Sequence, residues 1–326
     1  MLELLSPAGS PEAVIAAVQN GADAIYLGMG DFNARRGAKN FTNEEFEKAV
    51  TYCRIRGCRV YVTLNTLVND REMADAVAAA RLASACGADG IIIQDLGLIS
   101  AIRRALPDIP LHASTQMSIH NLAGVQAAAE MGLTRAVLAR ELSLEEIKYI
   151  TQNSPIETEI FVHGALCFCH SGQCYMSSLI GRRSGNRGMC AQPCRMQYSL
   201  GGRMDDYPMS LKDNCLVDRL REIEDAGVAC IKIEGRMKRP EYTAIVTGIY
   251  SKALKEHRQP TPEEMDMLTK AFSRQGFTQG YFNGDRKDMF GVRGEPEEGT
   301  EKIFTVARRA YADGELRRVP VHFYTV

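Results

Sequence analysis

Short apolar runs alternate with amphipathic segments along most of the chain. In the repeated pattern, a segment with apolar residues at i, i+3 and i+4 ends at a glycine, and a β-rich apolar run follows, as in residues 20–27, 56–64 and 86–93. Glycine at this place is typical of a helix that ends in the left-handed conformation. Continuously apolar strands that alternate with helices indicate a parallel sheet buried on both faces.

The pattern predicts eight strands. They cover residues 2–5, 24–27, 60–64, 91–93, 110–113, 136–138, 157–161 and 231–233. Helices are expected between them, among others at residues 11–19, 43–54, 72–84 and 122–130. Eight strand–helix units over roughly 250 residues match a (β/α)8 barrel of the TIM type, in the α/β class. An open doubly wound sheet is the alternative, but no Gly-x-Gly-x-x-Gly motif follows the first strand.

Two regions interrupt this pattern. A Cys-rich insertion at residues 164–210 precedes the last strand, and an irregular segment of this length inside a domain is usually functional. We therefore expect a barrel over residues 1–258, insertion included, and a helical and irregular extension over residues 259–300. Residues 301–326 are expected to begin a β-rich second domain, with strands at 302–308 and 318–326. Because the chain ends inside the second run, we expect that domain to be truncated.

Composition limits the classes of function. Hydrophobic residues at 45% and charged residues at 24% are ordinary for a soluble enzyme. A formal net charge of −1 gives no overall attraction to nucleic acid or to an acidic membrane. We find no signal peptide and no apolar run of the ~18 residues that a membrane span needs. Ten cysteines without a secretion signal favour reduced thiols, so we expect a cytoplasmic protein.

Four cysteines gather in the insertion. Cys167, Cys174, Cys190 and Cys194 have the spacing C-x6-C-x15-C-x3-C. The segment has too few large apolar residues to form its own core, and metal–thiolate bonds could supply the missing order. Four thiolates suit zinc or an iron–sulfur cluster, although structural zinc usually shows shorter spacings. From spacing alone, zinc, iron–sulfur and free thiols all stay open, with Cys169 and His170 as substitute ligands.

Polar residues at the carboxyl ends of the predicted strands complete the candidate site, because barrel enzymes place their chemistry at that face. We assign catalytic roles to His163, Glu234 and Arg236. The candidate substrate-binding residues are Asn65, Gln116, Arg140, Arg182, Arg183, Arg187 and Lys238. The arginines could hold carboxylates or phosphates. Ion pairs at the rim and a solvated basic loop are the alternatives, and His112 and His120 are expected to be structural.

The sequence resembles the collagenase-like peptidases of family U-32. The resemblance lies in residues 159–167 (EIFVHGALC) and 172–177 (GQCYMS), with further matching phrases at 5–9, 21–28, 186–190 and 232–236. It covers about residues 1–285. The resemblance implies a barrel and an oxygen-sensitive 4Fe-4S cluster. Several relatives are oxygen-independent hydroxylases of a base in tRNA or ribosomal RNA, with prephenate as oxygen donor, and others act on a quinone precursor.

We therefore expect an iron–sulfur RNA hydroxylase whose partners are tRNA or rRNA and a prephenate-like dicarboxylate. A collagenase-like peptidase is the first alternative, although the chain has no His-Glu-x-x-His helix and no Gly-x-Ser-x-Gly elbow. A quinone-precursor ring hydroxylase is the second alternative. The resemblance favours the RNA-acting branch, because the quinone-acting relatives have a longer insert before the last strand.

Overall fold

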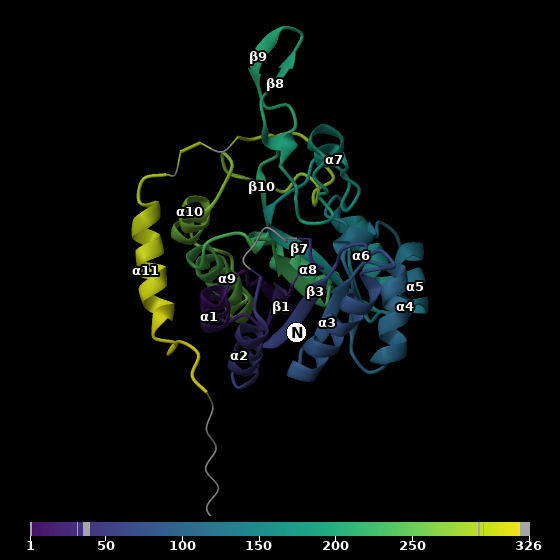
Figure 1. The fold of residues 1–326 in the computed structure, drawn as a ribbon. Helices are drawn as coiled ribbons and strands as arrows, with labels where there is room; N and C mark the ends of the chain where they lie inside the picture. The colour runs from purple at the N-terminus through teal and green to yellow at the C-terminus, as the bar shows by residue number, and fades with distance from the viewer. Residues whose placement is uncertain (1, 31, 35–39, 293, 296, 320–326) are drawn as a thin grey trace, which may run out of the picture.

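A closed barrel of eight parallel strands forms the body of the protein in the computed structural model, which describes residues 2–30, 32–34, 40–292, 294–295 and 297–319 (Figure 1). The strands are β1 (Glu3–Pro7), β2 (Ala24–Gly28), β3 (Arg59–Leu64), β4 (Gly90–Ile93), β5 (Leu111–Ala113), β6 (Arg135–Val137), β7 (Glu157–Ala165) and β11 (Cys230–Ile233). They pair in chain order from β1 to β7, and β11 closes the ring between β7 and β1. The predicted (β/α)8 barrel is confirmed.

Helices surround the barrel (Figure 1). They are α1 (Pro11–Gln19), α2 (Asn43–Arg54), α3 (Met73–Cys86), α4 (Leu96–Ala105), α5 (Leu122–Glu130), α6 (Leu144–Asn153), α8 (Leu220–Asp225) and α9 (Pro240–Glu256). Local sequence sets their ends: Thr42 and Ser143 form capping boxes with Glu45 and Glu146, and Gly87 ends α3 in the left-handed conformation. The four helices predicted in detail are confirmed to within two residues at each end.

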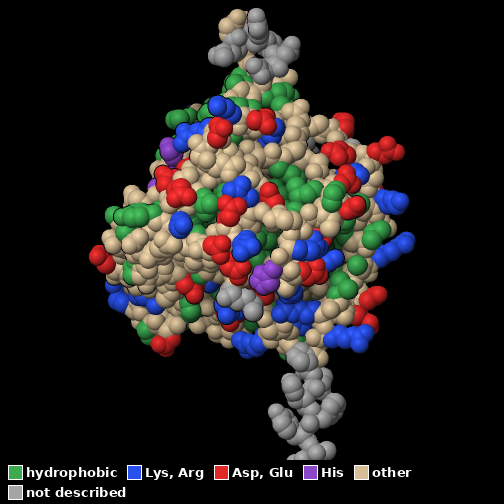
Figure 2. Space-filling model, turned by 180° about the vertical axis from the view of Figure 1, so that it is seen from behind, with side chains coloured by type: hydrophobic (Ala, Val, Ile, Leu, Met, Phe, Trp, Pro, Cys, Tyr) green, Lys and Arg blue, Asp and Glu red, His purple; other side chains and the backbone are tan. Residues whose placement is uncertain are grey.

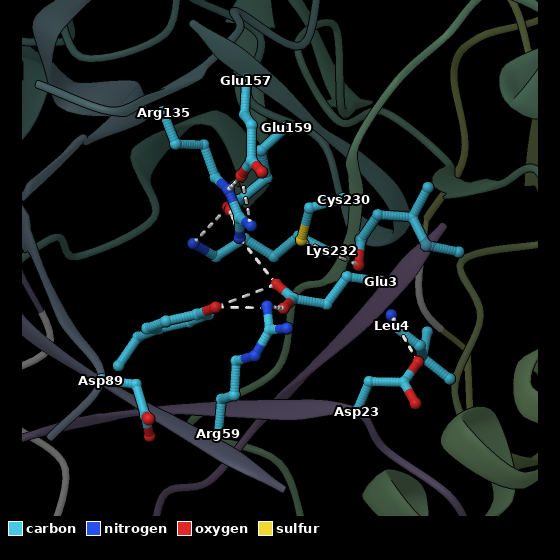
Figure 3. A network of polar contacts seen from close by, with 12 residues as sticks. Glu3, Leu4, Asp23, Arg59, Asp89, Arg135, Glu157, Glu159, Cys230 and Lys232 are labelled. Carbon is cyan, nitrogen blue, oxygen red and sulfur yellow. Dashed lines mark hydrogen bonds and ion pairs between the residues drawn. The ribbon is translucent and has the colours of Figure 1, made fainter. Parts of the chain in front are cut away.

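Charged side chains fill the barrel at the amino ends of its strands (Figure 3). Arg135 is 4% exposed and forms ion pairs with Glu3 at 2.6 Å, Glu157 at 2.7 Å and Glu159 at 3.5 Å. Lys232 Nζ lies 2.8 Å from the second oxygen of Glu159. Because charges at this end of a barrel lie away from the catalytic face, we assign this network to stability.

The Cys-rich insertion lies at the opposite end, beyond the carboxyl end of β7 (Figure 1). Its elements are α7 (Met176–Gly181), the short 3-10 helix η2 (Pro193–Arg195) and the hairpin strands β8 (Tyr198–Leu200) and β9 (Arg203–Asp206). After the hairpin, β10 (Asp213–Cys215) runs antiparallel to the end of β7, and β12 (Phe277–Thr278) pairs with β10. Two further 3-10 turns are η1 (Thr115–Met117) and η3 (Val217–Arg219).

The C-terminal part is helical where a β-structure was expected. After α10 (Pro262–Ala271), residues 302–308 lie in α11 (Thr300–Ala312), so the predicted strand there is wrong. Phe304 and Tyr311 lie two helical turns apart and are both buried, and Tyr311 donates to Glu12 on α1. Because both side chains pack toward α1 and α9, this segment forms a helix and not a strand. Residues 318–319 are not in a strand, and 320–326 lie outside the described residues. None of the described helices is long and apolar enough to span a membrane.

Candidate metal centre and its barrel mouth

The insertion is fastened to the loops that follow several barrel strands. Asn186 donates to Gln94 at 2.7 Å and accepts from the Leu67 amide at 2.9 Å. Arg187 makes a bidentate ion pair with Glu72, just before α3, with distances of 2.7 and 2.6 Å. The turn that carries Cys190 is therefore anchored to the loops after β3 and β4.

A second anchor lies between Cys167 and Cys174. The amide and the hydroxyl of Ser171 both donate to Glu141, at 2.9 and 2.8 Å, and the carbonyl of Ser171 accepts from Ser118. Gly172 has φ +79°, and a Cβ there would lie 2.5 Å from the carbonyl oxygen of Gln116. Glycine is needed here because the loop touches the barrel rim with its backbone.

The four predicted cysteines lie close enough to interact electrostatically. Cys167, Cys174 and Cys190 are exposed and Cys194 is half-buried, and all four thiols are free. Burial raises the pKa of Cys194; Arg195 lowers it, and Cys167, Cys190 and Cys174 each raise it further. The pKa of Cys169 is also raised, by burial and then by Cys174. Cys169 thus belongs to the same group of thiols.

Two arginines connect these thiols to the barrel. Arg195, next to Cys194, donates to the carbonyl oxygen of Leu166 at 2.6 Å and to that of Leu211. Arg140 follows β6 and is 8% exposed. One of its Nη atoms lies 3.1 Å from Glu234 Oε2, and the other lies 3.9 Å from Cys167 Sγ. Arg140 therefore joins a carboxylate of the barrel mouth to a candidate ligand.

Further cations lie inside the barrel below Arg140. Arg236 is 7% exposed and donates to Thr63 Oγ1 at 2.8 Å, and its guanidinium lies 5.6 Å from the centre of the Tyr26 ring. Lys232 Nζ lies 4.4 Å from the centre of the same ring. The predicted site residues Arg140, Glu234 and Arg236 thus lie toward the mouth, and Lys232, through the Tyr26 ring, links them to the charged network at the amino ends of the strands. Sequence reasoning missed Lys232 because a lysine inside a strand gives no motif.

His163 lies in a different environment. Its ring is 1% exposed and packs against Tyr242 and Tyr250 of α9 and Phe277, at 5.5–6.0 Å between ring centres. The pairing of β7 with β11 shifts by one residue just before His163, and such a bulge turns a side chain to the other face of a strand. Burial lowers the pKa of His163 to about 3. The ring is therefore neutral and packs outside the barrel, which does not suit the predicted catalytic role.

The other predicted substrate-binding residues hold loops or lie on the surface. Asn65 accepts from the Ala34 amide and donates to Ser114, which joins two rim loops. The Lys238 ammonium lies against the Phe272 ring, 2.7 Å from its centre. Arg182 and Arg183 are exposed beside the cysteines, just after α7. The anchoring role of Arg187 could have been found only from its distant partner, Glu72.

The insertion also differs in charge from the rest of the chain. Residues 164–203 contain five arginines and no Asp or Glu, whereas the remaining chain has 34 Lys and Arg against 40 Asp and Glu. Exposed apolar side chains lie among these arginines, including Phe168, Tyr175 and Leu179. In Figure 2, basic and apolar side chains, with some acidic ones beside them, lie just below the grey atoms at the top of the molecule. This face combines positive charge with exposed aromatic rings.

The comparisons with known proteins match this architecture. The profile of Peptidase family U32 matches residues 9–289. The chain belongs to peptidase family U32. A solved U32 peptidase superposes with a TM-score of 0.50 at 16% identity, covering 72% of this chain and 94% of that one, which supports the fold.

The names of the curated relatives describe two kinds of activity, RNA modification and collagen cleavage. The chain is 38% identical over 314 residues to the "23S rRNA 5-hydroxycytidine C2501 synthase" of Escherichia coli, covering 94% of this chain and 46% of that protein. It is 34% identical to the "tRNA hydroxylation protein P1" of Bacillus subtilis, with 89% and 73% covered. It is 33% identical to the "Collagenase" of Porphyromonas gingivalis, with 87% and 74% covered. The chain thus spans about half the length of the first relative.

Proposed function

We propose that this U32 protein hydroxylates a base in RNA, with a 4Fe-4S cluster held by Cys167, Cys174, Cys190 and Cys194. The observation that carries the proposal is the location of the four cysteines on the insertion that follows the carboxyl end of β7, in residues 164–203, which contain five arginines and no Asp or Glu. Barrel enzymes place their chemistry at this end. The names of two relatives, an rRNA synthase and a tRNA hydroxylation protein, support RNA as the substrate class.

The donor set fits a cluster. Four cysteine thiolates are the usual ligands of 4Fe-4S clusters, and one-electron transfer is the chemistry that such a cluster supplies when bound. The Arg140 guanidinium lies 3.9 Å from Cys167 Sγ, and the Gln192 amide donates to Cys190 Sγ at 3.4 Å. Donors and positive charge near the sulfurs stabilise thiolates and tune a cluster.

We propose that the exposed face of the insertion binds the RNA and that the barrel mouth binds the oxygen donor. The exposed Arg182 and Arg183 would contact phosphates, and Phe168 and Tyr175 would stack on unpaired bases. Hydroxylation replaces a base C–H by C–OH, so the base loses two electrons and a donor must supply oxygen and accept them. We propose a prephenate-like dicarboxylate as that donor. Arg140 and Arg236 at the mouth would hold its carboxylates.

Deletion and complementation test this function. Ribosomal RNA and tRNA from a strain without the gene are digested and analysed for hydroxylated nucleosides, with 5-hydroxycytidine as the first target. We expect a modification to disappear and the wild-type gene to restore it. Cys174→Ser should fail to restore it. Cys86→Ser, at the half-buried end of α3, is the matched control and should restore it. An unchanged nucleoside profile after deletion would refute the RNA assignment.

Anaerobic purification tests the cofactor separately. We expect a brown protein with equal amounts of iron and acid-labile sulfide, and a loss of both in Cys174→Ser but not in Cys86→Ser. A colourless protein with one zinc per chain would instead favour a structural metal. The name of the Porphyromonas relative makes peptidase activity the second candidate. Hydrolysis of a collagen peptide by the purified chain, with no change in RNA, would favour that candidate.

A further inference from the structure

Two histidines and a glutamate meet at the barrel rim beside the cysteines. His120 comes from the loop before α5, Glu141 from the loop after β6, and His170 from the insertion. One potential ligand atom from each lies within 4.8 Å of the other two. His120 Nε2 is 2.6 Å and His170 Nδ1 is 3.3 Å from the same oxygen, Glu141 Oε1. The two imidazole rings meet edge to face, with centres 5.5 Å apart.

The hydrogen bonds of His120 point to a cation at this place. Its Nδ1 lies 2.6 Å from the Ser118 carbonyl oxygen, which can only accept, so Nδ1 carries a proton. In a neutral ring, Nε2 then directs its lone pair at the carboxylate oxygen. That contact needs a second proton on Nε2 or a cation that both atoms share. A ring nitrogen bonded to a backbone carbonyl is the usual partner arrangement of a metal-binding histidine.

We propose that His120, Glu141 and His170 bind a divalent transition-metal ion of the Zn²⁺ class, separate from the four-cysteine ligands. Two imidazoles and one carboxylate are a known ligand set for zinc and for iron(II). Metal–ligand bonds of about 2.0–2.1 Å in tetrahedral geometry place ligand atoms about 3.3 Å apart. The distance from His170 Nδ1 to Glu141 Oε1 already has this value, and the 2.6 Å between His120 Nε2 and Glu141 Oε1 must lengthen by about 0.7 Å. The His170 side chain is 73% exposed, which leaves room for water ligands.

The ion would fasten the insertion to the barrel. Glu141 also accepts both hydrogen bonds of Ser171, which lies between Cys167 and Cys174. A metal on Glu141 and His170 would fix this stretch against the loops after β5 and β6. The site depends neither on the proposed RNA reaction nor on what the four cysteines bind. Its failure and that of the proposed function are therefore distinguishable.

Zinc binding by the 326-residue chain tests the site. Zn²⁺ is titrated by calorimetry into the wild type, His170→Ala and Glu141→Gln, and each protein is also heated with and without Zn²⁺. His257→Asn is the matched control: His257 is 77% exposed and 3.9 Å from Glu224, its φ is +48°, and Asn tolerates that conformation. We expect both site variants to lower zinc affinity at least about 10-fold. Zinc should raise the Tm of the wild type and the control, but not of His170→Ala.

Anomalous diffraction at the zinc edge locates the ion. A peak bonded to His120 Nε2, Glu141 and His170 supports the proposal. Zinc found only on cysteine sulfurs would overturn it, as would wild-type zinc affinity in both His170→Ala and Glu141→Gln. Because Glu141 also holds Ser171, a loss of folding in Glu141→Gln leaves the decision to His170→Ala, whose exposed side chain can be removed without disturbing the core.

Discussion

Replacing Arg135 by Met should destabilise the barrel far more than replacing its neighbour Arg59. Both arginines pair with Glu3 at 2.6 Å, but Arg135 is 4% exposed and Arg59 is 60% exposed. Without Arg135, the buried Glu3 loses its buried cation and Glu159 keeps only Lys232. Breaking a buried pair costs about 3–5 kcal/mol, because one charge is left uncompensated. An exposed pair contributes about 0.2–1 kcal/mol, which is the loss that we expect for Arg59→Met.

The loss of stability in Arg135→Met should also depend on pH. Burial raises the pKa of Glu159, but Lys232 and Arg135 outweigh it and hold that pKa below its usual value. A carboxyl with a depressed pKa stabilises the fold at pH values above its pKa in the unfolded chain, about 4.3, and this stability is lost as the pH falls through its pKa in the folded protein. In Arg135→Met the carboxyls protonate at higher pH, which removes their uncompensated charge. The difference from wild type should therefore shrink between pH 7 and pH 4.5.

Urea unfolding followed by circular dichroism at these two pH values measures both effects. Arg135→Lys keeps the charge but loses the paired donation of Nε and Nη2 to Glu157 Oε2, so its stability should lie between those of wild type and Arg135→Met. This variant also serves if Arg135→Met does not fold. Equal losses in Arg135→Met and Arg59→Met, or a loss that is the same at both pH values, would show that the buried charges are not coupled as described.

Three further predictions concern the catalytic end. Because the pKa of His163 is lowered, its neutral ring contributes fully to stability above pH 6.5, and the free energy of unfolding falls by up to about 1.4 kcal/mol per pH unit below that value. In His163→Phe, the free energy of unfolding should depend less steeply on pH. An unchanged pH dependence would contradict the buried neutral ring. Arg187→Met, which loses Glu72, should speed tryptic cleavage after Arg182 more than Arg183→Met does; equal cleavage rates would rule out the anchor. In the double variant Arg182→Gln/Arg183→Gln, the salt dependence of single-stranded RNA binding should fall by about 0.7 in log–log slope for each phosphate that is no longer neutralised, and an unchanged slope would place the RNA elsewhere.

The sequence was sufficient for the barrel because each strand–helix unit repeats the same local pattern. It failed at residues 302–308, where a short apolar run fits either element and distant contacts, such as that of Tyr311 with Glu12, favour a helix. The outward turn of His163 follows from one extra residue in β7, which no local pattern reveals. The pairing of Arg187 with Glu72 joins residues 115 positions apart. Such contacts are set by the closed barrel and not by neighbouring sequence.

The barrel and the insertion are held together by different kinds of contact. The barrel is stabilised by a continuous apolar core, whereas the insertion is anchored by polar contacts from Ser171, Asn186, Arg187 and Arg195. Polar contacts are directional, so they fix where the cysteines lie over the mouth with little buried apolar surface. Their net contribution to stability is small, about 1 kcal/mol each, so metal ligation could order this segment while the barrel stays folded without it. A polar, arginine-rich layer above an independent core would suit the proposed contact with a large anionic substrate.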